Sequence, residues 1–590
     1  MQLLLISMPW ALFNRPSIQL GTLKSFLSQH LEDVTLTVRH PSLEVAAAIG
    51  TQRYHQIAVN GWAGEALYSG LLFPGQRQQA GKLFQQELKA TDQSYSSLLL
   101  ILEEQLTIFL ERELHSECQL VGFSVCFNQL TASLWAAQEI KKLRPHLPIV
   151  FGGSSCTPQM GTALHKVFPA VDYLVSGEGE QPLRDLVNFL TGKGPFPGDT
   201  VFSVAASQPA SARPTAREVA DLNTLPFPDY SDYFFELARC GIPFIPQLPI
   251  EFSRGCWWNR CSFCNLNLQW QHYRTKKAER MAAEVRSLAQ QYQCLDFSFT
   301  DNALPPDAAR SFFKTMTDEQ AEYRFFAEVR AMQQPRQYAL SRQAGLTEIQ
   351  VGIEALSNSL LERMNKGTRV LDNIAAMKFA LEQDIRLSGN LILEFPGSTA
   401  IEVAETLTAL QAVFPYPPLQ AATFFLGQGS PVHCQPRRFG LTAVTIHPKY
   451  RILFPAFFLD QVEMLIQSYR ADRQHQKKLW APVRQQMAAW TTFHSQRDPT
   501  RQPALSYRDG SDFLLIRQER AGQPTLHHRL RGLSRAIYLQ CRQPVEQKEL
   551  LQTFNRVKEE QLMHFLADLA EKGLLFQDQD ACLALAVHAH

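Results

Sequence analysis

Short apolar runs alternate with helical patterns over the first 205 residues. The runs that predict buried strands lie at 2–8, 35–38, 120–125, 148–153 and 171–177, and helical periodicity is clear at 17–29 and 131–143. Parallel strands that are covered on both faces read as continuous apolar runs and need helical crossovers between them. The pattern therefore predicts an α/β protein with an N-terminal doubly wound, Rossmann-like domain over 1–205 and a helical insertion at about 60–115.

A second alternation follows a polar, Pro-rich stretch at 206–235, which predicts a linker. Strands are expected at 250–252, 295–300, 324–329, 347–353, 388–393 and 421–426, with helices at 278–292, 371–382 and 400–413. Six strand–helix units in about 190 residues predict a partial (β/α)6 TIM-like barrel over 236–447, because a complete eight-unit barrel takes roughly 250 residues.

The pattern changes again after 447. A helical segment rich in Gln and Arg is expected over 448–502, with its helices at 455–495. The tail at 503–590 predicts two short strands (513–517 and 525–530), three helices (533–539, 546–554 and 559–572), and a closing strand after Gly573. That order is typical of a small winged-helix-like module for peptide recognition or packing.

Composition narrows the class of protein. Hydrophobic residues make up 45% and charged residues 19%, which is ordinary for a globular chain. The 57 basic and 56 acidic residues leave a net charge of +1, so no electrostatic footprint for nucleic acid or an anionic membrane is expected. The start of the chain lacks the features of a signal peptide, and no uncharged apolar run reaches the roughly 18 residues of a membrane span. We expect a cytoplasmic protein that acts as a monomer.

Three of the eleven cysteines lie close together and carry the strongest chemical signal. Cys256, Cys261 and Cys264 follow the first barrel strand, in the string Gly255-Cys-Trp-Trp-Asn-Arg-Cys-Ser-Phe-Cys264. Three thiolates on one loop hold three irons of a 4Fe–4S cluster and leave the fourth iron open for another ligand. The alternative is structural zinc, with His272 as the fourth ligand. Grouped cysteines in either case indicate a reducing compartment.

Three cysteines on the loop after the first strand of a partial barrel resemble the radical S-adenosylmethionine (SAM) superfamily. The spacing departs from its usual pattern, because four residues instead of three separate the first two cysteines. The resemblance implies a 4Fe–4S cluster on these cysteines and SAM bound at its open iron. The residues that it places beside SAM are Phe263, Asp301, Asn302, Glu328, Arg330, Glu354, Pro396 and Gly397.

The N-terminal domain resembles the cobalamin-binding domain of cobalamin-dependent radical enzymes, through the strings at 16–21, 122–124, 151–153 and 176–180. Glycines at the carboxyl ends of parallel strands allow a large flat ligand to approach the backbone. No Asp-x-His-x-x-Gly motif occurs, and the loop 124–129 stands in its place, so the resemblance implies base-off methylcobalamin without a histidine ligand. The alternative is a doubly wound domain that binds a nucleotide or nothing. The residues implied in cobalamin binding are Pro16, Ser17, Ser124, Phe127, Asn128, Gln129, Gly152, Gly153, Gly177, Glu178 and Gly179.

Over most of its length the chain resembles the radical SAM C-methyltransferases that mature ribosomally synthesised peptides. The strings that carry this resemblance are Met8-Pro-Trp, 16–24, Gly255-Cys-Trp-Trp258, Gly429-Ser-Pro-Val432 and Phe439-Gly-Leu. It implies methyl transfer from methylcobalamin to a carbon of a precursor peptide through a 5′-deoxyadenosyl radical, with a flavodoxin- or ferredoxin-type electron donor. Two alternatives share the cofactors: formation of a ring such as a cyclopropane, and methylation of an sp² carbon without hydrogen abstraction. A cobalamin- or peptide-binding protein without turnover is the alternative of another class.

Overall fold

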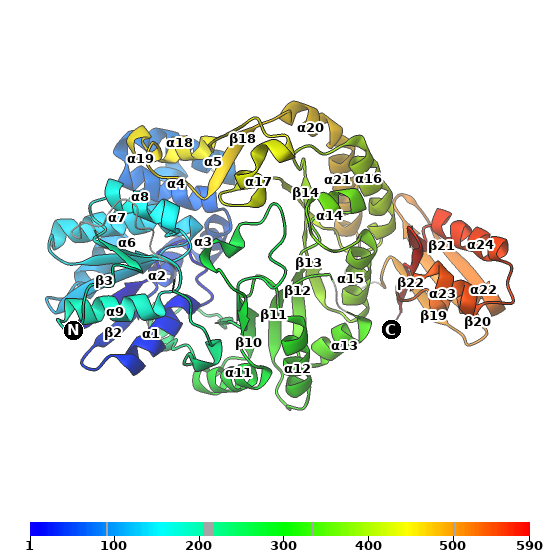
Figure 1. The fold of residues 1–590 in the computed structure, drawn as a ribbon, viewed down its shortest axis with the longest axis horizontal. Helices are drawn as coiled ribbons and strands as arrows, with labels where there is room; N and C mark the ends of the chain where they lie inside the picture. Colours follow the sequence, from blue (N-terminus) through cyan, green and yellow to red (C-terminus); the bar gives the residue numbers. More distant parts are fainter. Residues whose placement is uncertain (90–91, 204–216, 332–333, 499–501, 590) are drawn as a thin grey trace.

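The structure is a computed structural model that describes residues 1–89, 92–203, 217–331, 334–498 and 502–589. An N-terminal α/β unit lies beside a central parallel sheet. A cap, formed by residues 426–495, joins the two along one edge (Figure 1). The C-terminal module lies on the far side of the central sheet (Figure 1). Within the described residues, no helix combines the length and the apolar character that crossing a membrane demands.

The N-terminal sheet has the order β2-β1-β3-β4-β5-β6, and β6 alone is antiparallel to its neighbour. Chain order reverses between β1 and β3, which is where doubly wound sheets hold their ligands. The strands are β1 (Gln2–Ile6), β2 (Thr35–Arg39), β3 (Cys118–Ser124), β4 (Ile149–Gly152), β5 (Tyr173–Val175) and β6 (Val201–Ser203). The crossover helices are α1 (Ile18–His30), α7 (Leu130–Leu143), α8 (Pro158–Val167) and α9 (Glu180–Leu190).

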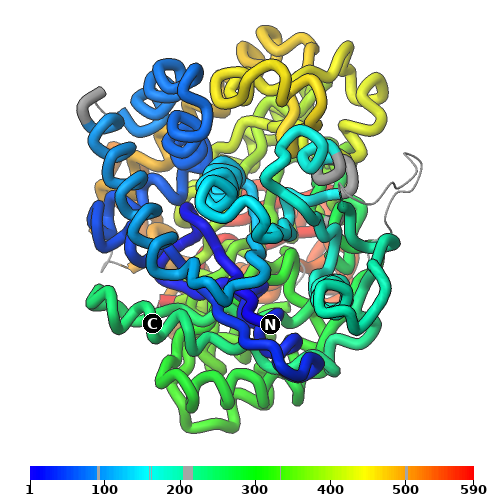
Figure 2. Tube along the Cα trace, turned by 90° about the vertical axis from the view of Figure 1, so that its left-hand side faces the viewer, coloured from blue at the N-terminus to red at the C-terminus, as the bar shows by residue number. Residues whose placement is uncertain are grey.

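The helical insertion is longer than the prediction of 60–115. It begins at Pro41 and comprises α2 (Pro41–Ile49), α3 (Thr51–Ala58), α4 (Gly61–Leu72), α5 (Arg77–Leu88) and α6 (Asp92–Glu113). The first two helices were missed because each has fewer than ten residues, too few to establish a helical period. Seen from the side of the N-terminal unit, the insertion helices lie next to the cap (Figure 2), and α18 (Pro448–Leu453) of the cap contacts α4 and α5.

The central sheet runs β13-β12-β11-β10-β7, all parallel, and a separate parallel pair, β14-β15, adjoins it through a bridge between Glu354 and Leu391. Gly389 separates β13 from β14, and a Cβ there would lie 2.9 Å from the carbonyl oxygen of Val351, so the strand turns at a glycine. The strands are β7 (Leu248–Ile250), β10 (Asp296–Phe299), β11 (Arg324–Val329), β12 (Leu346–Val351), β13 (Arg386–Ser388), β14 (Asn390–Leu393) and β15 (Gln420–Thr423). The helices are α10 (Ser231–Cys240), α11 (Ala278–Tyr292), α12 (Pro306–Thr317), α13 (Pro335–Gln343), α14 (Asn358–Arg363), α15 (Val370–Glu382) and α16 (Ala400–Val413).

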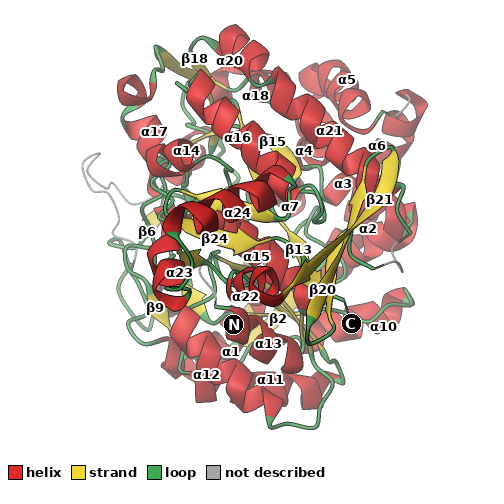
Figure 3. Ribbon diagram, turned by 90° about the vertical axis from the view of Figure 1, so that its right-hand side faces the viewer, coloured by secondary structure: helices red, strands yellow, loops and turns green. Residues whose placement is uncertain are grey.

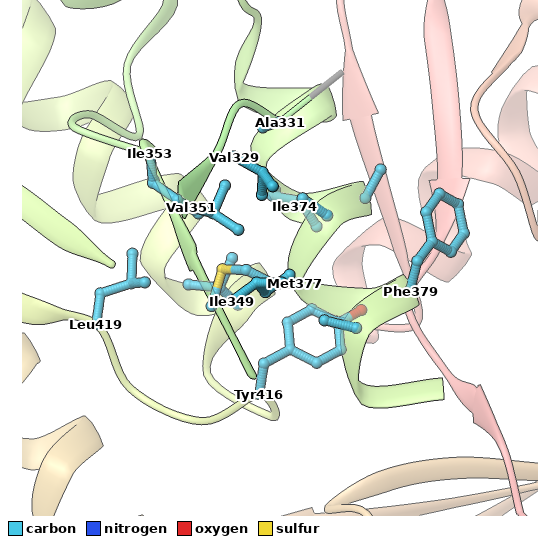
Figure 4. Close-up of a cluster of buried hydrophobic side chains, with 14 of the residues drawn as sticks. Val329, Ala331, Ile349, Val351, Ile353, Ile374, Met377, Phe379, Tyr416 and Leu419 are labelled. Carbon is cyan, nitrogen blue, oxygen red and sulfur yellow. The ribbon is translucent and has the colours of Figure 1, made fainter. Parts of the chain in front are cut away.

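Helix α15 is buried on two sides. Ile374 and Met377 point toward Ile349 and Val351 of the sheet (Figure 4). The opposite side of the helix contacts three strands of the C-terminal module, β23 (Leu575–Asp578), β24 (Ala581–Ala584) and β25 (Val587–His588). A helix that is apolar all round needs cover on every face. Sheet, helix and C-terminal module consequently share one hydrophobic core.

The cap contains a strand that was not predicted. Residues 455–495 were expected to be helical, but β18 (Ile466–Arg470) lies between β16 (Leu426–Gly427) and β17 (Ala443–Ile446) in an antiparallel sheet. Strand β18 pairs with residues about 20 to 40 positions away in the chain, so the local sequence pattern does not predict it. The helices of the cap are α17 (Pro431–Cys434), α18 (Pro448–Leu453), α19 (Ala456–Leu459), α20 (Arg473–Leu479) and α21 (Ala481–Ser495).

The C-terminal module has more strands than predicted (Figure 3). Its first sheet has the order β21-β20-β19-β25, with β19 (Leu505–Asp509), β20 (Phe513–Arg520), β21 (Gln523–Arg531) and β25 (Val587–His588). Its second runs β22-β24-β23, with β22 (Val545–Glu546), β23 (Leu575–Asp578) and β24 (Ala581–Ala584). The predicted helices are present as α22 (Gly532–Gln540), α23 (Gln547–Thr553) and α24 (Glu559–Glu571). The likeness to a winged helix stays a prediction.

Candidate functional site

A short hairpin closes the loop that carries the cysteines. Strand β8 (Ser253–Arg254) pairs antiparallel with β9 (Arg274–Thr275), so the intervening residues form one closed loop at the end of β7. Gly255 has a φ of 85°, and a Cβ there would lie 3.2 Å from the carbonyl oxygen of His272. A glycine is therefore needed where the chain leaves the hairpin toward Cys256.

Cys256, Cys261 and Cys264 are free thiols, each partly buried. Burial raises the pKa of Cys261, and the nearby charges of Lys366 and Arg330 oppose that rise. Burial likewise raises the pKa of Cys264 to about 11, with a contribution from the other two thiols. Three neighbouring thiols beside two cations suit a negatively charged iron–sulfur cluster.

The zinc alternative lacks its fourth ligand. The His272 side chain is 75% exposed, and its Nδ1 lies 2.8 Å from a carboxylate oxygen of Glu218. Across the described ranges, no three His, Cys, Asp or Glu side chains, these cysteines included, converge closely enough to hold a single metal ion.

The turn after α14 holds the cysteine loop in place. Ser262 donates its backbone N–H to the carbonyl oxygen of Met364 at 2.8 Å. Trp258 donates its indole N–H to the carbonyl oxygen of Asn365 at 2.9 Å. Gly367 has a φ of 69°, and a Cβ there would lie 2.0 Å from the Trp258 ring. The cysteine loop therefore packs against the turn Met364-Asn-Lys-Gly367, and this contact leaves no room for a side chain at position 367.

Cations and unpaired donors gather beside the thiols. The Arg330 guanidinium lies 5.2 Å from the ring centre of Trp257 and 4.5 Å from that of Trp258. Its Nε and the indole N–H of Trp257 are buried without a partner. Lys366 Nζ lies 3.0 Å from Glu354 and 5.9 Å from the ring of Phe263. Buried donors without partners are costly, so this region is suited to a bound carboxylate-bearing ligand such as SAM.

Burial raises the pKa of two of the acidic residues predicted to lie beside SAM, Asp301 and Glu328. Asp301 is 2% exposed and accepts hydrogen bonds from the Phe252 N–H at 3.0 Å and from the Ser253 hydroxyl. Burial raises its pKa to about 7. It therefore anchors the chain that leads into the cysteine loop, and Asn302 follows it. Burial also raises the pKa of Glu328 to about 7, with help from the charge of Glu354.

Pro396 and Gly397 do not join the cysteines in one cavity. They line a separate small hollow with Glu394, Gly440 and Tyr469. The carbonyl oxygen of Gly397 accepts a hydrogen bond from Arg363 at 2.5 Å. The structure thus brings Phe263, Arg330 and Glu354 to the cysteine loop and assigns these two residues to the neighbouring turn.

A cavity lies at the switch point between β1 and β3. Six of the predicted cobalamin residues line it: Ser124, Gly152, Gly153, Gly177, Glu178 and Gly179. Gly153 has a φ of 102°, and a Cβ there would lie 2.7 Å from the carbonyl oxygen of Val125, so this rim requires glycine. No histidine is among the described residues that line the cavity, and the absence of a histidine ligand stays a prediction.

The wall of the cavity opposite the sheet was not predicted. It comes from the central domain and comprises Glu251, Arg254, Gln269, Trp270 and Thr300, and the helix α1 adds Ile18–Leu23 in part. The sequence did contain a signal for this wall. Glu251 and Arg254 follow a strand and come just before Cys256, and the loops after parallel strands lie together at the carboxyl edge of a sheet, where ligands bind.

Five residues predicted to bind cobalamin are not among the residues that line the cavity. Ser17 caps α1 by accepting the N–H of Leu20. Phe127 packs edge-on against Trp62, and Asn128 donates to the carbonyl oxygens of Trp10 and Ala58. The remaining two are Pro16, next to that cap, and Gln129, which donates to Ser7 and Met8. These five residues shape the loops around β1 and β3, and their contact with cobalamin stays a prediction.

Comparison with known proteins identifies the central domain. Residues 250–410 match the model of the Radical SAM superfamily. The chain is 24% identical over 294 residues to an uncharacterized methyltransferase of Pyrococcus horikoshii and 27% identical over 314 residues to the anaerobic magnesium-protoporphyrin IX monomethyl ester cyclase of Cereibacter sphaeroides. These matches cover 49% and 48% of this chain and only 63% and 48% of the relatives.

A solved structure shares the fold over a longer stretch. The radical SAM methyltransferase TsrM from Kitasatospora setae, with cobalamin and a 4Fe–4S cluster bound, superposes with a TM-score of 0.54 at 16% identity. The alignment covers 84% of this chain and 89% of TsrM. The family match places Cys256, Cys261 and Cys264 within a radical SAM domain, and the structural likeness confirms the α/β fold with a parallel-sheet core.

Proposed function

We propose that the chain is a cobalamin-dependent radical SAM methyltransferase that acts on a carbon of a ribosomally synthesised peptide. One observation carries the proposal: the switch-point cavity is walled on one side by the glycine loops of the N-terminal sheet and on the other by Glu251 and Arg254. These two residues lead directly into Cys256. A ligand in the cavity consequently lies next to the cysteine loop, which is what transfer between two cofactors needs.

The residues present fit both cofactors. The cysteines, Arg330 and Lys366 suit a cluster with SAM at its open iron, and the glycine rim admits a flat macrocycle. When bound, these groups supply a 5′-deoxyadenosyl radical and a transferable methyl group, with electrons from a flavodoxin- or ferredoxin-type donor. Trp257 and Trp258 lie on the cysteine loop with their rings edge to face, 6.4 Å between ring centres, and they are suited to exclude water from the ligands.

Anaerobic reconstitution tests the proposal. We expect the wild-type protein to show cluster absorption, to retain base-off cobalamin without nitrogen hyperfine splitting, and to cleave SAM to 5′-deoxyadenosine after reduction. Joint replacement of Cys256, Cys261 and Cys264 by Ala should abolish the cluster absorption and the cleavage. Activity that survives this replacement, or a colourless protein that holds zinc, would refute the proposal.

Ring formation is the second candidate, because a cyclase is among the relatives. Product mass separates the two reactions. Methylation adds one carbon and two hydrogens to the peptide, whereas ring closure by loss of hydrogen removes two hydrogens. A deuterium label at the target carbon that appears in 5′-deoxyadenosine would distinguish hydrogen abstraction from direct methylation of an sp² carbon.

Recognition of the peptide is proposed for the C-terminal module. Strand β21 forms the edge of its sheet among the described residues and exposes His527, Arg529 and Arg531. An extended peptide adds to such an edge through backbone hydrogen bonds, and the basic side chains favour an acidic segment. Joint Arg529→Glu and Arg531→Glu replacement should weaken binding of a fluorescent acidic peptide, measured by anisotropy. Arg556→Glu on the same module is the control, and equal loss in both proteins would contradict this role.

A further inference from the structure

A cluster of buried charges lies between the switch-point cavity and the cysteine loop. Arg254, 8% exposed, places Nη2 2.6 Å from Glu180, Nε 2.9 Å from Glu251 and Nη1 3.1 Å from Glu178. All four residues also line the cavity. Glu178 and Glu180 follow β5 of the N-terminal sheet, whereas Glu251 and Arg254 follow β7 of the central sheet. One guanidinium thus joins the two domains at the cavity.

A second guanidinium extends the cluster to the far end of the cysteine loop. Arg274 on β9 places Nη2 2.6 Å from Glu178 and 3.3 Å from Glu218. Arg254 and Arg274 face each other across the β8–β9 hairpin. Glu178 therefore receives a guanidinium from each strand of the hairpin that closes the loop, so the carboxylate fixes the base of the loop against the N-terminal sheet.

Arginine is needed at this position for a physical reason. Three carboxylates that meet in a buried place repel one another unless a cation contacts all of them. A guanidinium offers five donors in a fixed planar fork and reaches three partners at once, whereas an ammonium is a point charge on a flexible chain. The charges accordingly raise the pKa of Arg254 and lower that of Glu180. Without the guanidinium, the two walls of the cavity are expected to separate.

We propose that Arg254 is a positioning residue that sets the distance and orientation between the ligand of the switch-point cavity and the cluster on the cysteine loop. The inference rests on the proposed function. A shift of about 1 Å between reacting groups costs up to roughly a hundredfold in rate. Loss of Arg254 should consequently impair transfer between the two cofactors more than it impairs the binding of either one.

A matched control lies in the same domain. Lys276 Nζ is 2.7 Å from Glu284, and the two side chains are 4% and 0% exposed. This pair is as buried as the Arg254 cluster, but neither residue lines the cavity. Lys276→Met therefore strands a buried carboxylate, as Arg254→Met does, at a position that does not line the cavity.

The experiment compares Arg254→Met, Arg254→Lys and Lys276→Met in the reconstituted full-length protein. The structural readout is the EPR line shape of cob(II)alamin beside the reduced cluster, because the dipolar coupling between the two spins reports their distance. The second readout is the rate of cobalamin methylation divided by the rate of 5′-deoxyadenosine formation. Arg254→Met should change the coupling and lower this ratio by roughly tenfold or more, Arg254→Lys should restore part of it, and Lys276→Met should leave both within about twofold of wild type.

Wild-type coupling and an unchanged ratio in Arg254→Met would overturn the inference. If Arg254→Met does not fold, Glu251→Gln replaces it, because this variant removes one negative charge from the cluster and leaves Arg254 paired with Glu178 and Glu180. It should move both readouts in the same direction by a smaller amount, and no change in either would equally overturn the inference. A wild-type protein that retains no cobalamin would instead refute the proposed function.

Discussion

Replacing Gly367 by Ala should displace the cysteine loop from the turn at 364–367 against which it packs. The residue has a φ of 69°, and a Cβ there would lie 2.0 and 2.1 Å from two atoms of the Trp258 ring. The ring is also held by the hydrogen bond from its N–H to Asn365. The methyl group cannot fit without moving the ring, and the ring belongs to the loop that carries Cys256 and Cys261.

The expected cost has two parts. Left-handed backbone at a residue with a Cβ costs roughly 1–2 kcal/mol, and forcing an extra methyl group into packed surroundings adds about 1–3 kcal/mol. Gly192→Ala isolates the first part, because Gly192 has a φ of 73° and nothing lies within 4 Å of its would-be Cβ. The free energy of unfolding should therefore fall by roughly 2–5 kcal/mol in Gly367→Ala and by about 1–2 kcal/mol in Gly192→Ala.

The assay measures iron per protein and cluster absorption after anaerobic reconstitution, alongside denaturant unfolding of the cluster-free protein. Gly367→Ala should lose most of its cluster, whereas Gly192→Ala should retain it. Adding Trp258→Ala to Gly367→Ala removes the clash, so the double variant should recover part of the lost stability. Equal cluster content in the two glycine variants, or strictly additive effects in the double variant, would refute the reasoning.

Three further predictions test other parts of the molecule. Gly153→Ala should reduce the cobalamin retained after gel filtration and leave the iron content unchanged, because its Cβ would displace the rim of the cavity. The raised pKa of Glu328, about 7 against an ordinary 4.5, means that the folded protein holds a proton that the unfolded chain has released. The free energy of unfolding of the protein should therefore fall by about 2 kcal/mol as pH rises from 5 to 7, and this slope should be smaller in Glu328→Gln. Asp578→Ala removes the acceptor of the Asn358 amide and the Leu371 N–H and should lower stability by about 1–3 kcal/mol in denaturant unfolding.

The sequence predicted the elements whose pattern is local. Strand β11 and helices α11 and α16 have the bounds expected from the pattern. Buried parallel strands and amphipathic helices can be predicted from the order of apolar and polar residues within the element itself. Strand β18 was not predicted, because its residues Ile-Gln-Ser-Tyr-Arg do not alternate between apolar and polar and its partners lie far away in the chain. Tertiary pairing decided its conformation.

In the candidate site, too, the features with a local sequence pattern were predicted and those that depend on distant contacts were not. The cysteines and the glycine rim were predictable, since a motif and a strand end suffice to place a backbone. Side-chain direction was not: Asn128 and Gln129 are close to Ser124 in the chain but turn into the loops around β1. The wall formed by Glu251 and Arg254 was also missed, because it depends on how two domains meet.

The C-terminal module cannot be removed to learn its role. Helix α15 begins three residues after Gly367, and its N-terminal turn donates the N–H of Leu371 to Asp578 of the module. Lys378 of the same helix is fully buried and donates to the carbonyl oxygen of Arg542. Truncation at 503 would expose the apolar face of α15 and remove the acceptor of Lys378, so it would disturb the turn that holds the cysteine loop whatever the module binds. Peptide recognition is therefore separable from packing only through exposed positions such as those on β21, where substitution leaves the shared core intact.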